Sequence, residues 1–483
     1  MRVLITIILS LVVLLSMPAI AKSSSSATAH PPVSVKTLDL PNLPWTMENG
    51  VKVFHLTAEI VKQEILPANG MAPAKVLTLW GYNGSAPGPT IEVNEGDRVR
   101  IIFHNNLPED STVHWHGLEI PIEMDGLPYL SQNPVKPGQS FTYEFTLHQN
   151  GTYFYHSHSA MQEMMGMIGL FIIHPKKDYD PPVQKDFAMI LQEYSVLPNN
   201  PIPNSMSMEF NWLTINGKAA PATTPLIVRL GDRVRMRFVN LGMDHHPIHL
   251  HGNQFYLTGT EAGRIPKSAW FPQNTIIVGV AQARDVEFTA KYPGDWMLHC
   301  HLPHHMMNNM VSMVGPMTMS DMQHGMKTGM GMEEGMGMVR QGNATSEELG
   351  PGLGRGMSVT ADRERNISHA IHQNQEQNVA IAEDAKTKPG YPQDAMMDMP
   401  MDEAVAKPET NYLPARWSAS LSGMMTLVRV LPPEQYDKIM ADIKAHRIIK
   451  PGTGMNMRGT GSPHEHMHMP GMEHMDMPGM QMK

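Results

Sequence analysis

The stretch that decides the fold is Gly294-Asp295-Trp296-Met297-Leu298-His299-Cys300-His301-Leu302-Pro303-His304-His305-Met306-Met307-Asn308-Asn309-Met310, which holds the only cysteine in the sequence. If this stretch begins as a β-strand, its period of two places His299 and His301 on one face and Cys300 on the other. His305 follows Cys300 by five residues, and Met310 follows it by ten. One segment can therefore present ligands to two metal sites, with Cys300 linking them.

A thiolate, an imidazole and a thioether in this order are typical of a mononuclear copper site that also needs a second imidazole. That imidazole is absent from the stretch itself. His246 can supply it, because in His246-Pro247-Ile248-His249-Leu250-His251-Gly252 it stands alone, three residues ahead of a His-x-His pair. We therefore predict one copper site made of His246, Cys300, His305 and Met310.

Eight further histidines come as four His-x-His pairs, and the two members of a pair share one face of a strand. Eight neutral imidazoles without a thiolate or a carboxylate suit a cluster of three copper ions that binds O2. Such a cluster can receive electrons through the covalent bonds between Cys300 and its two neighbours. The pairs are His114 and His116, His156 and His158, His249 and His251, and His299 and His301.

Composition limits the class of protein. The 483 residues suffice for two or three domains, and a net charge of −9 without a basic stretch argues against nucleic acid as a partner. A single cysteine rules out a disulfide framework and leaves the thiol for metal binding. Residues 1–21 have the charge, apolar run and small-residue end of a secretory signal peptide. We expect a secreted or periplasmic protein with no membrane anchor after cleavage of this peptide.

Short segments rich in β-branched and aromatic residues, separated by Gly, Pro and Asn turns, predict an all-β protein. The same motifs occur twice and in the same order. Residues 96–100 are echoed by 231–235, and residues 150–158 are echoed by 292–301. An internal duplication of one antiparallel β-sandwich explains both echoes.

This duplication predicts the domain plan. After an N-terminal tether at 22–45, we expect domain 1 at 46–178 and domain 2 at 179–320. Residues 321–483 are rich in Met, Gly and His with little apolar patterning, which is typical of a largely disordered tail. Within this tail, residues 433–446 have a proline at the start and apolar spacing that predict one short helix.

The copper motifs resemble those of the multicopper oxidases, the family of laccase, ascorbate oxidase and ceruloplasmin, over roughly residues 50–315. The resemblance implies two cupredoxin-like Greek-key domains and four coppers per active unit, one of type 1, one of type 2 and a type 3 pair. Carried over by motif position, the type 2 ligands are His114 and His249, the type 3 ligands are His116, His156, His158, His251, His299 and His301, and the type 1 ligands are His246, Cys300, His305 and Met310.

Domain 1 has Ser157 where domain 2 has Cys300, so one type 1 copper is expected per chain. The chain also lacks the middle domain of three-domain members between His158 and His246. It is most similar to the two-domain, laccase-like subfamily with the type 1 copper in the second domain. The members of that subfamily form homotrimers, which implies trinuclear sites between protomers. Closure of the site within one chain is the alternative.

The resemblance also implies catalytic roles. Reduction of O2 to water consumes protons, and the family pattern points to Asp125 as the proton relay, although an Asp before Gly126 is also typical of a turn. Electrons would enter at His305 and pass through Cys300. The reducing substrate is expected to be a phenol or cuprous ion, and Met306 and the Met-rich tail offer soft ligands for the latter.

Three other functions are compatible with parts of this pattern. One is a copper-tolerance cuprous oxidase with little activity on phenols, and another is a non-catalytic protein that sequesters copper. A two-domain copper nitrite reductase shares the fold and the trimer. It carries its type 1 site in the first domain and needs only three histidines for its second metal, so the eight paired histidines argue against it.

Overall fold

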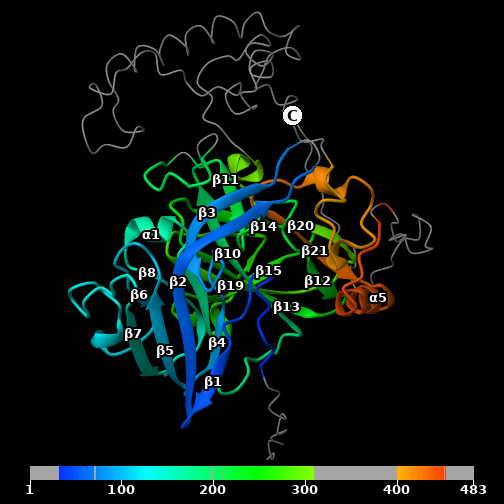
Figure 1. Cartoon of the computed structure of the whole chain (residues 1–483). Coiled ribbons are helices and arrows are strands. Elements are labelled where there is room, and N and C mark those ends of the chain that lie inside the picture. The colour runs from blue at the N-terminus through cyan, green and yellow to red at the C-terminus, as the bar shows by residue number, and fades with distance from the viewer. Residues whose placement is uncertain are drawn as a thin grey trace, which may run out of the picture.

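The computed structural model describes residues 32–69, 72–196, 200–208, 210–308, 400–450 and 452. Nearly all regular structure in this part of the chain is β-strand, which confirms the predicted all-β class. The strands form two sandwiches of two sheets each that lie side by side (Figure 1). The predicted signal peptide falls outside the described residues.

The first sandwich pairs a five-stranded sheet with a four-stranded one. In the larger sheet, Val99, Ile101 and Phe103 are buried while their neighbours along the strand are not, as period-two packing requires. This sheet has the order β1–β2–β5–β7, with β3 paired to β2, and comprises β1 (Trp45–Glu48), β2 (Val51–Leu66), β3 (Lys75–Tyr82), β5 (Arg98–Asn105) and β7 (Ser140–Thr146). The smaller has the order β4–β9–β8–β6 and comprises β4 (Ile91–Asn94), β6 (Val113–His116), β8 (Gly151–Ser157) and β9 (Ile168–His174). Two short helices, η1 (Ile122–Met124) and α1 (Ala160–Met164), lie in its loops.

The second sandwich repeats this plan with a seven-stranded and a five-stranded sheet. The larger has the order β11–β10–β13–β19–β15–β16, with β17 paired to β15; it comprises β10 (Lys185–Tyr194), β11 (Trp212–Ile215), β13 (Arg233–Asn240), β15 (Phe255–Thr260), β16 (Gly263–Arg264), β17 (Pro272–Gln273) and β19 (Gln282–Thr289). The smaller has the order β12–β21–β20–β14–β18 and comprises β12 (Leu226–Arg229), β14 (His246–Leu250), β18 (Thr275–Val278), β20 (Gly294–Cys300) and β21 (Met425–Leu431). Its described helices are η2 (Lys267–Ala269), η3 (Pro303–Met306), η7 (Pro408–Thr410), η8 (Trp417–Ser420) and α5 (Pro433–Lys444).

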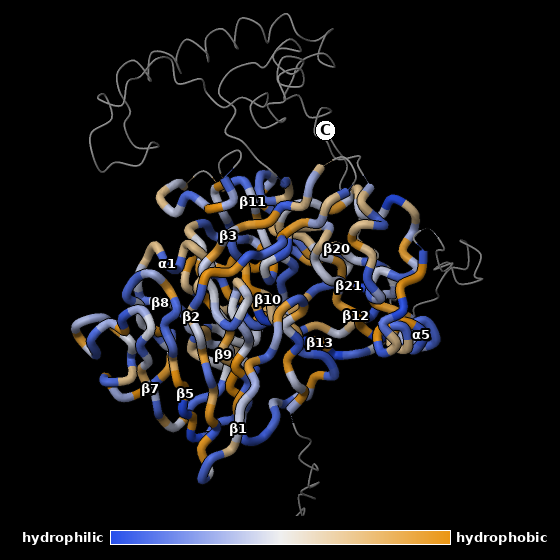
Figure 2. Tube along the Cα trace, in the orientation of Figure 1, coloured by the Kyte–Doolittle hydropathy of each residue, from blue (hydrophilic) through white to orange (hydrophobic). Residues whose placement is uncertain are grey.

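Apolar residues fill each sandwich and also the interface between the two, so the hydrophobic segments of the tube run through the middle of the molecule (Figure 2). At the interface, Phe154 and Leu170 of domain 1 belong to the same buried cluster as Ile190 and Val239 of domain 2. Removing this apolar surface from water stabilises the contact between the domains, by roughly 25 cal/mol for each Å² buried. The two sandwiches are therefore packed as one body.

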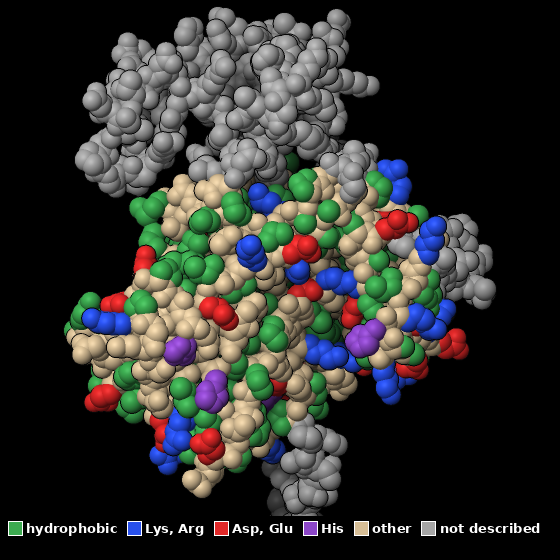
Figure 3. Space-filling view, in the orientation of Figure 1, with side chains coloured by type: hydrophobic (Ala, Val, Ile, Leu, Met, Phe, Trp, Pro, Cys, Tyr) green, Lys and Arg blue, Asp and Glu red, His purple; other side chains and the backbone are tan. Residues whose placement is uncertain are grey.

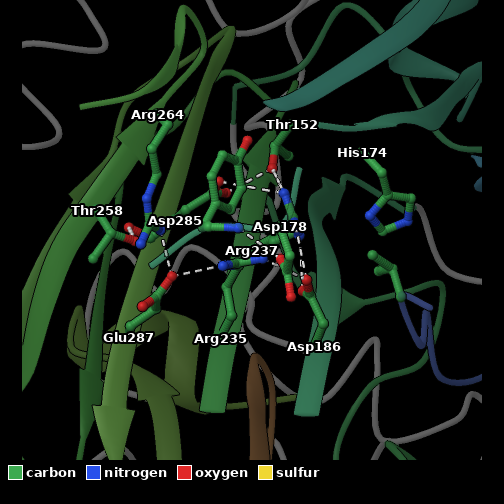
Figure 4. A network of polar contacts seen from close by, with 12 residues as sticks. Thr152, His174, Asp178, Asp186, Arg235, Arg237, Thr258, Arg264, Asp285 and Glu287 are labelled. Carbon is green, nitrogen blue, oxygen red and sulfur yellow. Dashed lines mark hydrogen bonds and ion pairs between the residues drawn. The ribbon is translucent and has the colours of Figure 1, made fainter. Parts of the chain in front are cut away.

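A buried polar network also crosses this interface (Figure 4). The Oγ1 atom of Thr152, on β8, donates to Asp285 at 2.6 Å and accepts from Arg237 at 2.6 Å. Arg237 also donates from Nε to Asp186 at 2.8 Å. Burial raises the pKa of Asp285, whereas the charges of Arg237 and Arg235 offset the burial of Asp186 and hold its pKa low. These charges are paired, so the network fixes the relative position of the domains without leaving an isolated buried ion.

Two predicted boundaries need correction. The predicted tether at 22–45 is packed from residue 32 onward: Val35 is buried between the domains, and Lys36 bridges to Phe187 of domain 2. The reason is a series of spaced apolar residues, of which Leu43 is buried in the core of domain 1. The first sheet then begins at β1.

The tail predicted at 321–483 contains a part of domain 2. Residues 400–450 are folded, and β21 lies inside the smaller sheet, antiparallel to β20 and parallel to β12. The helix α5 (Pro433–Lys444) lies where the sequence predicts one, and it packs on the second domain through Ile439. The strand was not predicted because the Met-rich segments on both sides of it led to the whole region being assigned to the tail. Residues 309–399 and 453–483, which carry most of the Met-rich patches, fall outside the described residues.

The surface shows no concentration of one charge on the face seen in Figure 3, where acidic and basic side chains are interspersed. Among the helices that the structure describes, none is both long and apolar enough to cross a lipid bilayer.

Candidate metal centres

Two neighbouring strands of domain 2 place the predicted type 1 residues. β14 and β20 pair so that Ile248 lies opposite Cys300 and His249 lies opposite His299. Because paired residues share a face of the sheet, His246 lies on the Cys300 face and His249 on the His299 face. The odd spacing of three between His246 and His249 thus assigns them to different sites. His305 approaches from η3, directly after β20.

The donor atoms of these three residues converge in the interior. Cys300 Sγ lies 3.4 Å from His305 Nδ1 and 3.8 Å from His246 Nδ1, and the two Nδ1 atoms are 3.1 Å apart. All three side chains are buried. The structure therefore brings together the three residues that the sequence predicts from distant parts of the chain.

Two carboxylates orient the imidazoles from behind. His246 Nε2 donates to Glu193 Oε2 at 3.0 Å, and His305 Nε2 lies 3.4 Å from Asp244 Oδ2. A proton held at Nε2 leaves the lone pair on Nδ1, the atom that faces Cys300. Glu193 is fully buried and also accepts from the backbone N–H groups of Met243 and Asp244. Sequence analysis missed both carboxylates, although Asp244 stands only two residues before His246.

This donor set fits copper. Two imidazoles and one thiolate, all buried, can form the trigonal core of a type 1 copper site. Burial raises the pKa of the Cys300 thiol to about 12, and burial followed by the nearby His246 lowers the pKa of His305. A neutral imidazole is ready to bind metal, whereas the thiol must release its proton when the metal binds. Met310, the predicted fourth ligand, falls outside the described residues.

In domain 1, the four predicted histidines form one cluster on β6, β8 and the loop that follows. His116 Nδ1 lies 3.4 Å from His156 Nε2, and the ring of His114 lies 5.3 to 5.6 Å from the other three. His114 Nδ1 donates to the carbonyl of Asp125 at 2.8 Å, which leaves its Nε2 free. Burial and then the neighbouring imidazoles lower the pKa of His116 to about 4. The low pKa of His116 favours its neutral form, which is the form that binds a metal.

Domain 2 carries the matching cluster on β14, β20 and the residue that directly follows each of these strands. His251 Nε2 lies 3.1 Å from His299 Nε2, and the ring of His249 lies 4.9 to 5.6 Å from those of His251, His299 and His301. His249 Nδ1 donates to the carbonyl of Asn274 at 2.7 Å, and His299 Nδ1 donates to that of Cys300 at 2.8 Å. Burial lowers the pKa of His251 and of His299.

The two clusters are separate from each other within one chain. Every ring contact among these eight described histidines joins residues of the same domain. His158, His251 and His301 are exposed on the surface. Each cluster therefore has at least one imidazole at the protein surface.

Asp125, the predicted proton relay, lies beside the domain 1 cluster. Its Oδ1 atom is 3.5 Å from His114 Nδ1, and its side chain is 28% exposed. The turn that carries it is tight, because Gly126 has φ +80° and a Cβ there would lie 1.8 Å from the carbonyl oxygen of Val113. Asp125 therefore contacts both a cluster histidine and solvent.

Domain 1 also contains a counterpart of the type 1 site without metal ligands. Ser157 stands in the place of Cys300, Gln162 follows it by five residues as His305 follows Cys300, and Ser111 precedes His114 as His246 precedes His249. Both serine hydroxyls donate to Gln162 Oε1, at 2.8 Å from Ser111 and 2.6 Å from Ser157. The polar side chains of this counterpart therefore satisfy one another by hydrogen bonds.

Comparisons with known proteins agree with these sites. Two family models, each described as multicopper oxidase, match residues 67–178 and 195–316. The chain is 37% identical over 118 residues to copper resistance protein A of Pseudomonas syringae pv. tomato, which covers 24% of this chain and 19% of that protein. It is 42% identical over 112 residues to Laccase-1 of Emericella nidulans, which covers 23% and 18%. The chain thus spans only about a fifth of the length of these curated relatives.

Among solved structures, the multicopper oxidase mgLAC is 30% identical, with 53% of this chain and 81% of that chain covered and a TM-score of 0.49. One family model falls on each sandwich, and the second includes the strand that carries Cys300. Copper is the metal of this family, and the buried cluster of two histidines and one cysteine suits it. The chain belongs to the multicopper oxidase family.

Proposed function

We propose that this protein is an exported oxidase that couples one-electron oxidation of a small reducing substrate to the four-electron reduction of O2 to water. The observation that carries the proposal is the arrangement around β20. Cys300 Sγ lies within 3.8 Å of two imidazole Nδ1 atoms on one face, and His299 and His301 belong to a histidine cluster on the other. Export is inferred from the signal peptide predicted at 1–21.

The chain itself provides the route for electrons between the two kinds of site. When bound, copper supplies one-electron redox chemistry at the type 1 site and the binding and reduction of O2 at the histidine clusters. Cys300 is bonded through the backbone to His299 and His301. In addition, the Nδ1–H group of His299 donates to the carbonyl of Cys300 at 2.8 Å, which gives a second, shorter connection from the cysteine to an imidazole.

The trinuclear site is assigned to two chains. His114 and His249 are the proposed type 2 ligands, and the other six paired histidines are the proposed type 3 ligands. Support comes from the separation of the two clusters within one chain and from the exposure of His158, His251 and His301. Contact between domain 1 of one copy and domain 2 of the next, repeated around a threefold axis, gives a closed homotrimer.

Asp125 is the proposed proton relay. Its carboxylate is close to His114 and partly open to water, so it can take a proton from solvent and deliver it beside the cluster. An amide in its place keeps the shape of the side chain but carries no exchangeable carboxyl proton.

His305 is the proposed point of electron entry, with a phenol or cuprous ion as the donor. Asp244 is 39% exposed and lies 3.4 Å from His305 Nε2, which links the buried imidazole to the surface. Cuprous ion is favoured as one donor because two thioethers are exposed close to these residues in the sequence, Met243 directly before Asp244 and Met307 two residues after His305. Soft sulfur ligands are those that Cu(I) prefers.

The experiment is to load the full-length chain with copper and to follow visible absorption, O2 consumption and mass in solution together. We expect an intense copper–thiolate absorption, O2 uptake with a phenol or with Cu(I), and a trimer. Dilution to a protein concentration at which the trimer dissociates should abolish O2 uptake, while the copper–thiolate absorption per chain persists. Copper uptake without this absorption would refute the oxidase and favour sequestration. Undiminished turnover by isolated monomers would refute the shared site.

A further inference from the structure

The internal duplication provides a reference for the type 1 loop. In domain 1 the order β4–β9–β8–β6 matches the order β12–β21–β20–β14 in domain 2, so β9 corresponds to β21 and β8 to β20. The pairing registers agree as well, because His156 lies opposite Ile168 and His299 lies opposite Met425. The residue before each of these partners is a methionine, Met167 in domain 1 and Met424 in domain 2.

These two methionines make equivalent backbone hydrogen bonds. In domain 1, the N–H of Ser157 donates to the carbonyl of Met167 at 3.2 Å, and the N–H of Met167 donates to that of Gln162 at 3.3 Å. In domain 2, the N–H of Cys300 donates to the carbonyl of Met424 at 3.0 Å, and the N–H of Met424 donates to that of His305 at 2.8 Å. Met424 is therefore tied to both the cysteine and the histidine of the type 1 site.

The side chain of Met424 also lies on the side of the sheet that the type 1 site occupies. Met425 is paired with His299 and shares its face, so Met424 shares the face of Cys300. Met424 is fully buried and belongs to the same core cluster as Cys300 and Ile248, whereas Met425 belongs to a different cluster.

The approach of this segment to the type 1 loop requires a glycine. Gly423 has φ +63°, and a Cβ there would lie 2.3 Å from the carbonyl oxygen of His305. The N–H of Gly423 donates to Asn308 Oδ1 at 3.0 Å, and Asn308 Nδ2 donates to the carbonyl of Ala220 at 2.7 Å. These contacts hold the start of β21 against the end of the His305 loop.

We propose that the thioether of Met424 is the axial ligand of the type 1 copper, in the place that the sequence spacing gave to Met310. In domain 1 the residue ten positions after Ser157 is Met167, which occupies this place directly. In domain 2 residues 309–422 are inserted after Asn308, and Met424, which follows them, takes the same place. The assignment rests on the proposed function, since it presupposes a type 1 copper. It makes residues 400–450 part of the metal centre.

The test compares methionine variants of the full-length, copper-loaded protein. Met424→Leu removes the sulfur with little change in volume, so the reduction potential should shift upward and the visible and electron paramagnetic resonance spectra should change. Met424→Gln supplies a harder oxygen and should shift the potential downward. Met310→Leu and Met167→Leu should leave the potential and both spectra unchanged. Circular dichroism of each variant verifies that the fold is retained.

Each result decides the assignment. Opposite shifts for the two Met424 variants, with none for Met310→Leu, establish it. A shift for Met310→Leu with none for Met424→Leu overturns it and leaves the proposed oxidase intact. Unchanged spectra in all four variants would also overturn it, because no methionine would then contact the metal. A wild-type chain that binds copper without copper–thiolate absorption would refute the proposed function, and the assignment with it.

Discussion

The two sandwiches place different side chains in one backbone frame. In domain 1, Ser111, Ser157 and Gln162 satisfy one another, and Gln162 Nε2 also donates to the carbonyl of Asp110 at 2.9 Å. In domain 2, His246, Cys300 and His305 occupy the corresponding places, and their lone pairs face one another.

The difference teaches that the fold supplies the geometry and that a few side chains decide its use. A hydroxyl and an amide can pair as donor and acceptor, so the domain 1 set is complete without a metal. Two imidazole lone pairs and a thiolate repel one another unless a cation lies between them. The same frame therefore gives a structural hydrogen-bond cluster in one domain and a redox site in the other.

The largest effect is expected when the sulfur of domain 2 is replaced by the oxygen found in domain 1. Cys300→Ser should abolish the copper–thiolate absorption and lower O2 consumption by more than about 100-fold, since even outer partners of metal ligands are worth about 10–100-fold. Visible spectroscopy and an oxygen electrode measure both effects. Ser157→Ala is the matched control and should retain the absorption. A serine variant that stays blue would contradict the role of Cys300.

An intermediate effect is expected when Glu193, the carboxylate that accepts from His246 at the type 1 site, loses its charge. Glu193→Gln keeps the shape but removes the charge that accepts from His246, so copper affinity at the type 1 site should fall by about 10–100-fold. Competition with a chelator measures this affinity. Glu92→Gln is the matched control, because Glu92 accepts from His174 in domain 1 at 2.7 Å without facing a metal residue. Equal loss in both variants would point to a general effect of the fold.

The smallest effect is expected in domain 1. Ser157→Ala removes the hydrogen bond to Gln162, whose oxygen still accepts from Ser111, and the longer one that Ser157 Oγ accepts from the Ser159 N–H at 3.2 Å. The free energy of unfolding should fall by about 0.5–1.5 kcal/mol for each lost bond. Denaturant unfolding of the copper-free protein measures this change. A loss much larger than this would mean that the serine cluster supports more of the domain than its hydrogen bonds indicate.

The fold class and the three type 1 residues His246, Cys300 and His305 could be predicted because the sequence shows strong periodic patterns. The alternation of His299, Cys300 and His301 and the spacing to His305 encode local geometry, so they could be interpreted without coordinates. Glu193 could not be found in this way, since it lies at the end of a buried strand and only the tertiary fold brings it to His246.

Met424 was missed for a related reason. The spacing of ten that holds in domain 1 fails in domain 2, where residues 301–424 separate β21 from its partner strand β20. A pattern confined to a short window selects Met310, while the pairing of β20 with β21 selects Met424. Long-range strand pairing is a property of the whole sheet and leaves little trace in local sequence.

The position of β21 also sets an order of events for the newly made chain. β20 and β21 are adjacent in space but far apart along the chain, and contacts of such long sequence separation form late in folding. Synthesis runs from the N-terminus to the C-terminus, so every histidine of the proposed metal centres is made before β21, the strand that closes the type 1 site. Copper captured before β21 has paired with β20 would be held loosely, so secure loading must wait until nearly the whole chain has been made.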